Sequence, residues 1–334
     1  MGSDPISPWW MAARPRTLTA SLVPIVVGLS IAPPRGAADV GIAAATVLAA
    51  LCIQVAVNFA NDYFDAAAGI DTAERLGPTR AVQAGLIPAV QMRRAFVGML
   101  AAAVVFGLPL VWRGGAAILV VGLLSMLCAW AYAGGPRPLA SLGLGDLFVF
   151  VFFGLVPVIG TVWLQRTDTA ALGFALLASI PVALLAVAIL VVNNLRDIPT
   201  DAAAGKLTMA VRLGERGARM QYALFVWIAM AWPLLLVTCF GPGVLLSLAA
   251  VPLAHRAVRD VGARAGSALN ASLAATARLQ LIHGLLLAAG IAAGTTCCEA
   301  AIRDGIHAHA GSAARGVILA DSLMVTRSGI AAGG

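Results

Sequence analysis

The sequence predicts an all-α integral membrane protein, a bundle of nine transmembrane helices. Composition is the first reason. The chain of 334 residues is 60% hydrophobic and only 11% charged, with a mean hydropathy of +0.93, whereas a soluble domain carries about 25% charged residues. The second reason is the length of the apolar runs, which greatly exceeds that of a strand and shows no alternation. This pattern disfavours a membrane β-barrel and favours helices, which satisfy their own backbone hydrogen bonds in lipid.

The nine expected spans are apolar runs bounded by charges or by clusters of proline and glycine. They cover residues 17–32, 40–64, 95–112, 115–132, 144–164, 170–195, 220–240, 243–258 and 274–294. The first and eighth runs are short for a hydrocarbon core of about 30 Å. The first could begin earlier, at Trp9 and Trp10, with bends at Pro15 and Pro24.

The basic residues predict the orientation of the bundle. With the N-terminus in the cytoplasm, nine spans place 16 of the 22 Lys and Arg residues in inside loops. Only Arg35, Arg113 and Arg166 fall outside, and three more lie in the C-terminal tail. This bias follows the positive-inside rule. The net charge of +7 therefore indicates cytoplasmic loops beside anionic lipid, and no motif points to a nucleic-acid partner.

The chain divides into a polytopic domain and a tail. Residues 1–294 hold all nine apolar runs, whereas residues 295–334 lose the apolar density. We expect this last segment to be a flexible tail.

Acidic residues gather at the end of the second apolar run. The stretch "NDYFDAAAGIDTAERLGPTR" begins at Asn61 and contains Asp62, Asp65, Asp71 and Glu74. The whole chain has only 15 acidic residues, so this gathering calls for an explanation other than a solvated loop.

A second copy of this pattern ends the sixth apolar run. The stretch "NNLRDIPTDAAAGK" overlays the first after a shift of 136 positions, with "DAAAG" identical in both. The shift places Asn194 on Asn58, Asp197 on Asn61, Asp201 on Asp65 and Gly205 on Gly69. Four spans separate the copies, and an even number returns the chain to the same membrane face. The two clusters can therefore meet.

Helical spacing directs these side chains to common faces. Asn61 and Asp65 are four residues apart, Asp62 and Asp65 three, and Asp197 and Asp201 four, so each group shares one helix face. Converging carboxylates repel one another and require cations. Oxygen ligands without His or Cys suit Mg²⁺, which keeps coordination sites for water and substrate phosphate.

Basic residues interleaved with the acids suit the other half of this chemistry. They are Arg75, Arg80, Arg196, Lys206 and Arg212. Together the two sets predict a site for Mg²⁺ and the diphosphate of a lipid precursor.

These motifs resemble the UbiA-type superfamily of intramembrane prenyltransferases. The likeness covers Trp10 to about residue 294 and rests on "ARPRTLTASLVPIVVG", "NDYFDAAAGIDTAERLGPTRAVQAGLI", "AYAGGPRPLASLGLGDLFVFVFFGLVPVIGT" and "NNLRDIPTDAAAGKLTMAVRLG". "GxDTxERLGPxR" and "YAGGPxPL" are most similar to the branch that uses 1,4-dihydroxy-2-naphthoate in menaquinone biosynthesis. The resemblance implies a UbiA-type fold in a bacterial cytoplasmic membrane, with active-site loops in the cytoplasm.

The resemblance also implies a mechanism. Mg²⁺ ions bridge the aspartates and the diphosphate of a polyprenyl donor, the C–O bond ionises, and the aromatic ring attacks the allylic cation with loss of CO₂. The metal ligands implied are Asp62, Asp65, Asp71, Asp197 and Asp201. The general motif N-x-x-x-D-x-x-x-D fits Asn61 and Asp65 but meets Gly at position 69, and Asp71 stands two residues later.

The remaining implied roles concern the two substrates. Arg80, Gln83 and Lys206 stand where the family contacts the donor diphosphate, so Lys206 joins Asp65, Asp197 and Asp201 in the catalytic set. Tyr132 stands at a position associated with the acceptor pocket. Asn61 and Asn194 complete the substrate-binding set, and Trp130 or Tyr132 could steady the cation through a ring face.

Two alternatives stay open at this point. One is a UbiA-type enzyme with another aromatic acceptor, such as hydroxybenzoate, homogentisate or haem. The other is a cation-coupled transporter, since intramembrane acids and repeats occur there as well.

Overall fold

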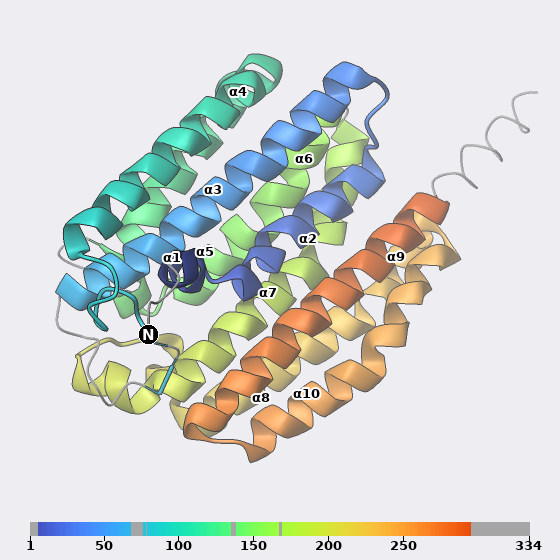
Figure 1. Cartoon of the computed structure of the whole chain (residues 1–334). Helices are drawn as coiled ribbons and strands as arrows, with labels where there is room; N and C mark the ends of the chain where they lie inside the picture. The colour runs from blue at the N-terminus through green and yellow to red at the C-terminus, as the bar shows by residue number, and fades with distance from the viewer. Residues whose placement is uncertain (1–5, 68–75, 78, 135–137, 167–168, 295–334) are drawn as a thin grey trace, which may run out of the picture.

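The computed structural model describes residues 6–67, 76–77, 79–134, 138–166 and 169–294. Every regular element within these ranges is helical (Figure 1). The α-helices are α1 (Ile6–Ala13), α2 (Pro15–Ile31), α3 (Ala37–Ala67), α4 (Ala89–Ala133), α5 (Gly145–Phe150), α6 (Val156–Gln165), α7 (Thr169–Ala203), α8 (Met209–Ala231), α9 (Pro233–Phe240) and α10 (Val251–Ala263). The segments η1 (Leu139–Leu142), η3 (Pro242–Ala250) and η4 (Gly266–Ala268) are 3-10 helices, and η2 (Val151–Leu155) is a π-helix. The stretch Gly266–Gly294 is called the C-terminal helix below.

All nine predicted spans fall in helices of the described chain. Six stretches are long and apolar enough to cross a bilayer, and Thr17–Ile31 is a shorter apolar helix. One of the six, in α4, holds the third and fourth spans, while η3 and α10 together form the eighth. The prediction of a nine-helix membrane bundle is therefore confirmed.

Helix α4 contains two spans because the chain reverses within it. Gly115 has φ 68° and ψ −157°, a conformation that strongly favours glycine because it has no Cβ. Just before the break, Arg113 pairs with Asp39 at the start of α3, with Nη2 2.7 Å from Oδ1. After the break, Tyr132 lines the same cavity as Asp65 at the end of α3. The two parts of α4 thus run in opposite directions along α3.

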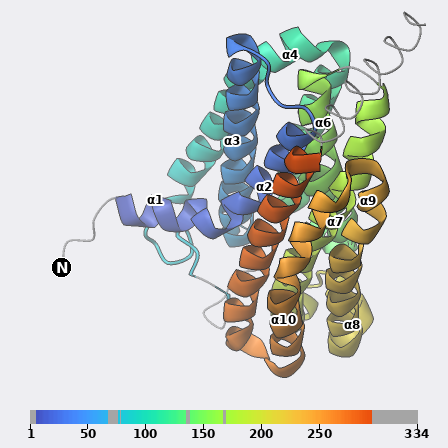
Figure 2. The same ribbon diagram turned by 90° about the vertical axis from the view of Figure 1, so that its right-hand side faces the viewer.

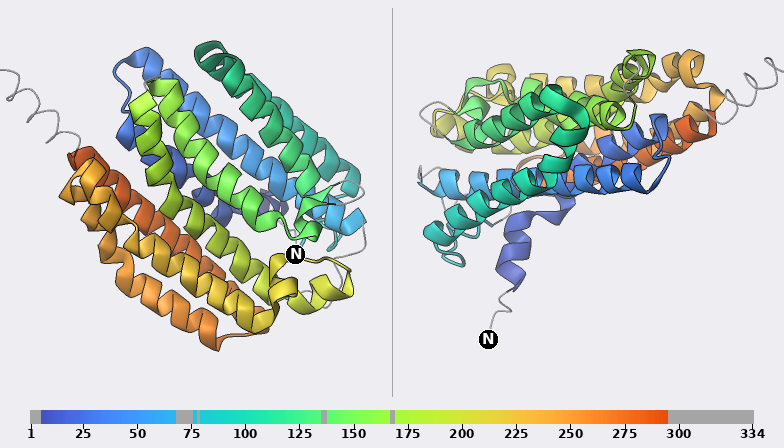
Figure 3. Two further views of the ribbon diagram at one scale, coloured as in Figure 1. Left: turned by 180° about the vertical axis from the view of Figure 1, so that it is seen from behind. Right: turned by 90° about the horizontal axis from the view of Figure 1, so that it is seen from above.

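Helix α1 differs from the expectation for the first span. Trp9 and Trp10 do not extend that span but form a separate helix, which ends at Arg14 in a left-handed conformation (φ 51°, ψ 68°). The Trp9 ring packs edge-to-face on Phe59 of α3, with centroids 5.8 Å apart. Helix α1 therefore projects from the side of the bundle (Figures 2 and 3).

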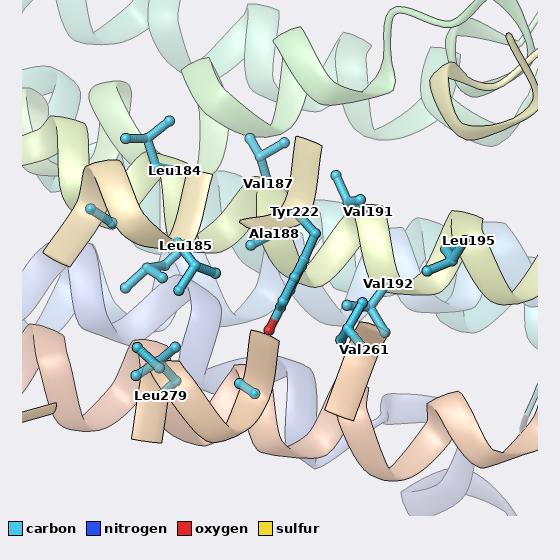
Figure 4. Packing of buried hydrophobic residues seen from close by; sticks show 14 of the residues in the cluster. Leu184, Leu185, Val187, Ala188, Val191, Val192, Leu195, Tyr222, Val261 and Leu279 are labelled. Carbon is cyan, nitrogen blue, oxygen red and sulfur yellow. The ribbon is translucent and has the colours of Figure 1, made fainter. Parts of the chain in front are cut away.

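Helix α7 forms the centre of the bundle. Most of its apolar window is buried, whereas most of α4 is exposed, as expected for a helix that faces lipid. Figure 4 shows Leu185 and Val192 of α7 packing with Tyr222 of α8, Val261 of α10 and Leu279 of the C-terminal helix. The long apolar run of α7 is thus explained by contact with helices on several sides.

Small residues allow the C-terminal helix to approach its neighbours closely. A Cβ built at Gly290 would lie 2.2 Å from the carbonyl oxygen of Gly243 in η3, and one at Gly284 would lie 2.2 Å from Val23 Cγ1 of α2. Close backbone approach at small residues is the usual packing of membrane helices, where lipid removes the hydrophobic drive for association.

Candidate active site

A long cavity runs inside the described part of the bundle. Its volume is about 950 Å³, and its walls come from α1 to α7 and the C-terminal helix. Along α3 it extends from Thr46 to Asp65, a difference of 19 positions or roughly 28 Å at 1.5 Å per residue. This length is close to the ~30 Å of a bilayer core.

Charged residues gather at one end of the cavity. Asp65 is paired there with two cations: Arg80 Nη2 lies 2.7 Å from its Oδ2, and Lys206 Nζ lies 3.1 Å from its Oδ1. Asp197 and Asp201 line the same cavity. Because Lys206 follows the second acidic motif and Asp65 belongs to the first, the two motifs meet, as the repeat predicted.

Asp197 is held by its neighbour Arg196. The Nε and Nη2 atoms of this buried guanidinium lie 2.7 and 2.6 Å from the two carboxylate oxygens. Arg196 also donates to Asn193 and to Asn270 Oδ1, and Asn270 Nδ2 donates to the carbonyl of Leu76. This chain of contacts fixes the Asp197 carboxylate and ties the start of the C-terminal helix to the loop that carries Arg80.

The residues present fit Mg²⁺ only together with a phosphate ligand. Within the described residues, no three His, Cys, Asp or Glu side chains are close enough to form a metal site by themselves, because Asp65 and Asp197 face cations. Mg²⁺ is usually bound by one or two carboxylates with water and substrate phosphate. Asn61 and Asn194 also line the cavity, and their side chains make no hydrogen bonds with the described part of the chain. Carboxylate and amide oxygens are thus present for such a shared site.

Comparison with known proteins decides the family. The model of the UbiA prenyltransferase family matches residues 21–274. The chain belongs to the UbiA prenyltransferase family. This membership favours an enzyme over the transporter alternative.

Two similar proteins in the family are named for one aromatic acceptor. The 1,4-dihydroxy-2-naphthoate octaprenyltransferase of Mycobacterium tuberculosis is 37% identical over 289 residues, 86% of this chain and 97% of that protein. The protein of the same name from Haemophilus influenzae is 34% identical, over 88% of this chain and 98% of its own.

A solved UbiA-family structure shares the fold. The UbiA homologue from Archaeoglobus fulgidus bound to GPP and Mg²⁺ aligns with a TM-score of 0.59 at 12% identity, over 84% of this chain and 99% of that one. The UbiA-type fold expected from the motifs is therefore confirmed.

Two of the predicted site residues lie away from the cavity wall. The Asp62 carboxylate accepts hydrogen bonds from the backbone N–H groups of Ala81 and Val82, at 3.0 and 3.1 Å, and Asp62 is not among the lining residues. Gln83 is exposed on the turn that follows Arg80 and does not line the cavity either. Asp62 therefore holds the loop that carries Arg80.

Other expected residues lie apart from the cavity or outside the described chain. Arg212 donates to the carbonyls of Leu207 and Leu142, so it fixes a loop. Trp130 is exposed and does not line the cavity, whereas Tyr132 does. Asp71 and Arg75 lie outside the described residues.

The structure adds lining residues that the motifs did not identify. Phe148 and Phe152 lie in the cavity wall with parallel rings, centroids 5.9 Å apart. Thr17, Gln54 and Asn58 line it as well. Gln54 and Asn58 carried a usable signal, because polar residues inside a membrane span are rare and usually functional.

Proposed function

We propose that the protein transfers a polyprenyl group from a polyprenyl diphosphate to 1,4-dihydroxy-2-naphthoate, with release of CO₂ and diphosphate, in menaquinone biosynthesis. The observation that carries the reaction type is a cavity nearly as long as a bilayer is thick, with paired acids and bases at one end and mainly apolar walls beyond it. The names of the similar proteins from M. tuberculosis and H. influenzae support the acceptor.

The donor diphosphate binds at the charged end. Arg80 and Lys206, now paired with Asp65, supply fixed positive charge for its oxygens. The prenyl chain lies along the apolar wall toward Leu110 and Ile118. Leaving diphosphate gains negative charge as the C–O bond breaks, so these cations stabilise the transition state more than the ground state.

The residues around the diphosphate site would hold Mg²⁺. We assign Asp65, Asp197 and Asp201 as its carboxylate ligands, with Asn61 and Asn194 as further oxygen donors, and we retain Asp71 as a candidate. Bound Mg²⁺ would neutralise the diphosphate and so assist its departure. Asp62 leaves the ligand set because both of its oxygens accept backbone hydrogen bonds.

The carbon chemistry takes place just inside the charged end. The electron pair of the C–O bond leaves with the diphosphate, and the allylic carbon becomes electrophilic. The ring carbon that bears the carboxylate forms the new C–C bond, and the carboxylate leaves as CO₂. Aromatic faces of Tyr132, Phe148 and Phe152 can steady the cation, and the apolar wall keeps water away from it.

The protein is an integral membrane protein, and we propose that it lies in a bacterial cytoplasmic membrane with the charged end of the cavity in the cytoplasm. The positive-inside bias supports this orientation. Arg113 and the backbone of Arg35 contact Asp39 at the start of α3, at the opposite end from Asp65. Two of the three expected outside arginines thus lie away from the charged end.

The acceptor is tested with purified protein, Mg²⁺ and a polyprenyl diphosphate. Dihydroxynaphthoate is compared with 4-hydroxybenzoate, and carboxyl-¹⁴C label reports the carboxylate. We expect prenylation of dihydroxynaphthoate with release of the label as CO₂. Prenylation of hydroxybenzoate alone, or product that retains the label, would contradict the proposal.

A further inference from the structure

The cavity has one polar wall that the donor does not explain. It consists of Thr17 and Ser21 of α2 and Gln54 and Asn58 of α3, called the α2–α3 polar face below. It begins just inside the charged end: Asn58 precedes Asp65 by seven positions and Gln54 by 11, roughly 10 and 16 Å along the helix. A prenyl chain has no polar atoms beyond its diphosphate, and placing it against polar groups costs free energy.

The opposite wall differs from this face at the position of Gln54. Leu190 of α7 precedes Asp201 by 11 positions, as Gln54 precedes Asp65, and both residues line the cavity. The two halves of the repeat therefore have a glutamine and a leucine at equivalent places. At the depth of Gln54 the α7 wall suits hydrocarbon and the α3 wall suits a ligand with hydrogen-bonding groups, whereas Asn58 is matched by Asn194 of α7.

The hydrogen bonds of the polar face fix the orientation of its amides. Asn58 Nδ2 donates to the carbonyl of Ala13 at 2.8 Å and to Thr17 Oγ1 at 3.2 Å. A carbonyl only accepts, so the Asn58 amide cannot be reversed. Gln54 Nε2 donates to the same Thr17 oxygen at 3.2 Å, and its Oε1 accepts from Ser21 Oγ at 3.2 Å.

This arrangement leaves one acceptor and one donor on the face. Asn58 Oδ1 receives no hydrogen bond from the residues that the structure describes, and one of the two Nε2 hydrogens of Gln54 stays unused there. The two residues are four positions apart, so their Cβ atoms lie about 5–6 Å from each other. A ring that carries a hydroxyl and a second oxygen substituent complements this pair.

We propose that the α2–α3 polar face binds the aromatic acceptor, with Asn58 Oδ1 accepting from a ring hydroxyl and Gln54 Nε2 donating to a second ring oxygen. This inference rests on the proposed function, because it names the second substrate's place in the same cavity. It puts the ring on the α2–α3 side near the charged end and the first part of the prenyl chain beside Leu190 of α7, before the chain continues toward Leu110 and Ile118. A hydroxyl that donates to a fixed acceptor makes the ring more electron-rich, which favours its attack on the allylic carbon.

The test separates the two substrates. Gln54→Leu copies the residue at the equivalent place in α7, and Asn58→Ala removes the acceptor. We expect KM for dihydroxynaphthoate to rise about tenfold or more, as for a lost hydrogen bond worth roughly 1.5 kcal/mol, while KM for the polyprenyl diphosphate stays within twofold. Equilibrium binding of dihydroxynaphthoate in detergent, followed by tryptophan fluorescence, should weaken by the same factor.

Tyr222→Phe is the matched control. It removes a buried hydrogen bond to Thr276, 2.8 Å long, between α8 and the C-terminal helix and outside the cavity. We expect it to lower the thermal midpoint without changing KM for the acceptor. If Gln54→Leu and Asn58→Ala behave like this control, or raise KM for both substrates equally, the face only joins α2 to α3 and the inference is wrong. If the parent enzyme does not prenylate dihydroxynaphthoate, the proposed function is wrong. KM of the parent and of the variants is then measured with the hydroxylated aromatic that the parent does prenylate.

Discussion

At the scale of single residues, the candidate site is a set of carboxylates already paired with cations. Asp65 contacts Arg80 and Lys206, and Asp197 contacts Arg196. Buried carboxylates require such partners because desolvated charge is costly. The motifs predicted these acids and most of these bases, but spacing alone could not predict that Asp62 turns toward backbone amides.

Lys206 is the single lysine of the chain, beside 21 arginines. Its compact ammonium can reach a diphosphate oxygen, whereas a planar guanidinium is larger and prefers forked contacts. We expect Lys206→Met to reduce kcat/KM for the prenyl diphosphate about ten- to a hundredfold, the loss of roughly 1.5–3 kcal/mol, and Lys206→Arg to restore only part. Parent-level kcat/KM in Lys206→Met, measured at saturating acceptor, would show that the charge serves topology alone.

Asp62 and Asp65 should fail in different ways although they are three positions apart. Asp62→Ala leaves two backbone N–H groups without their partner, at about 1–3 kcal/mol for each buried group, so we expect a lower thermal midpoint and a partial loss of activity. Asp65→Asn keeps the shape of the side chain but removes the counter-charge of Arg80 and Lys206, so we expect near-complete loss of turnover, well beyond what its lower thermal midpoint explains. Thermal unfolding in detergent and kcat are measured on both. Equal effects on both quantities would remove the distinction between a loop anchor and a site residue.

At the scale of helices, the repeat explains the site better than any single span does. Helices α3 and α7 each end in an acidic motif, and Lys206 after α7 reaches Asp65 on α3. This meeting could be predicted, because parity of the spans returns both motifs to one membrane face. The separate helix α1 could not, since its end depends on a left-handed Arg14 (φ 51°) that no local pattern marks.

The close packing of the C-terminal helix should be sensitive to any side chain added at Gly290. Gly290→Val would force its Cβ against the backbone of Gly243, 2.2 Å away, whereas a Cβ at Gly173 of α7 meets nothing within 4 Å. We expect Gly290→Val to lower the thermal midpoint and the yield of folded protein, and the control Gly173→Ala to leave both unchanged or slightly raised. If the two variants unfold at the same temperature, the contact between η3 and the C-terminal helix contributes little to stability.

At the scale of the whole molecule, the bundle joins a charged site at one end to a cavity long enough for a lipid chain. Its charged end gathers residues from α3, the loop with Arg80, α7 and Lys206, and the whole cavity runs roughly 28 Å along α3. Composition and charge bias were enough to predict the bundle, since lipid restricts the possible structures to very few. The cavity wall was less predictable, because membrane helices are apolar on every side and the sequence does not mark which apolar residues face lipid.

The pairing of acids with bases across the site leads to one prediction for the assembled enzyme. Mg²⁺ alone must displace Arg80, Lys206 or Arg196 from a carboxylate, and a prenyl diphosphate alone must draw the same cations away and leave Asp65 or Asp197 unpaired. When both ligands bind, the carboxylates pair with Mg²⁺ and the cations pair with the diphosphate. Each ligand should therefore raise the affinity of the protein for the other.

We expect the thermal midpoint in detergent to change little with Mg²⁺ alone or with geranyl diphosphate alone. With both ligands, it should rise by much more than the sum of the two separate shifts. Saturating ligand at a hundred times Kd adds about 2.7 kcal/mol of stability, which is easily measured. EDTA should reverse the shift and abolish turnover, and Asp201→Asn should reduce the non-additive part. Additive shifts in the parent would mean that the ion pairs do not compete with the ligands, and that Asp65 and Asp197 keep their present partners when the donor binds.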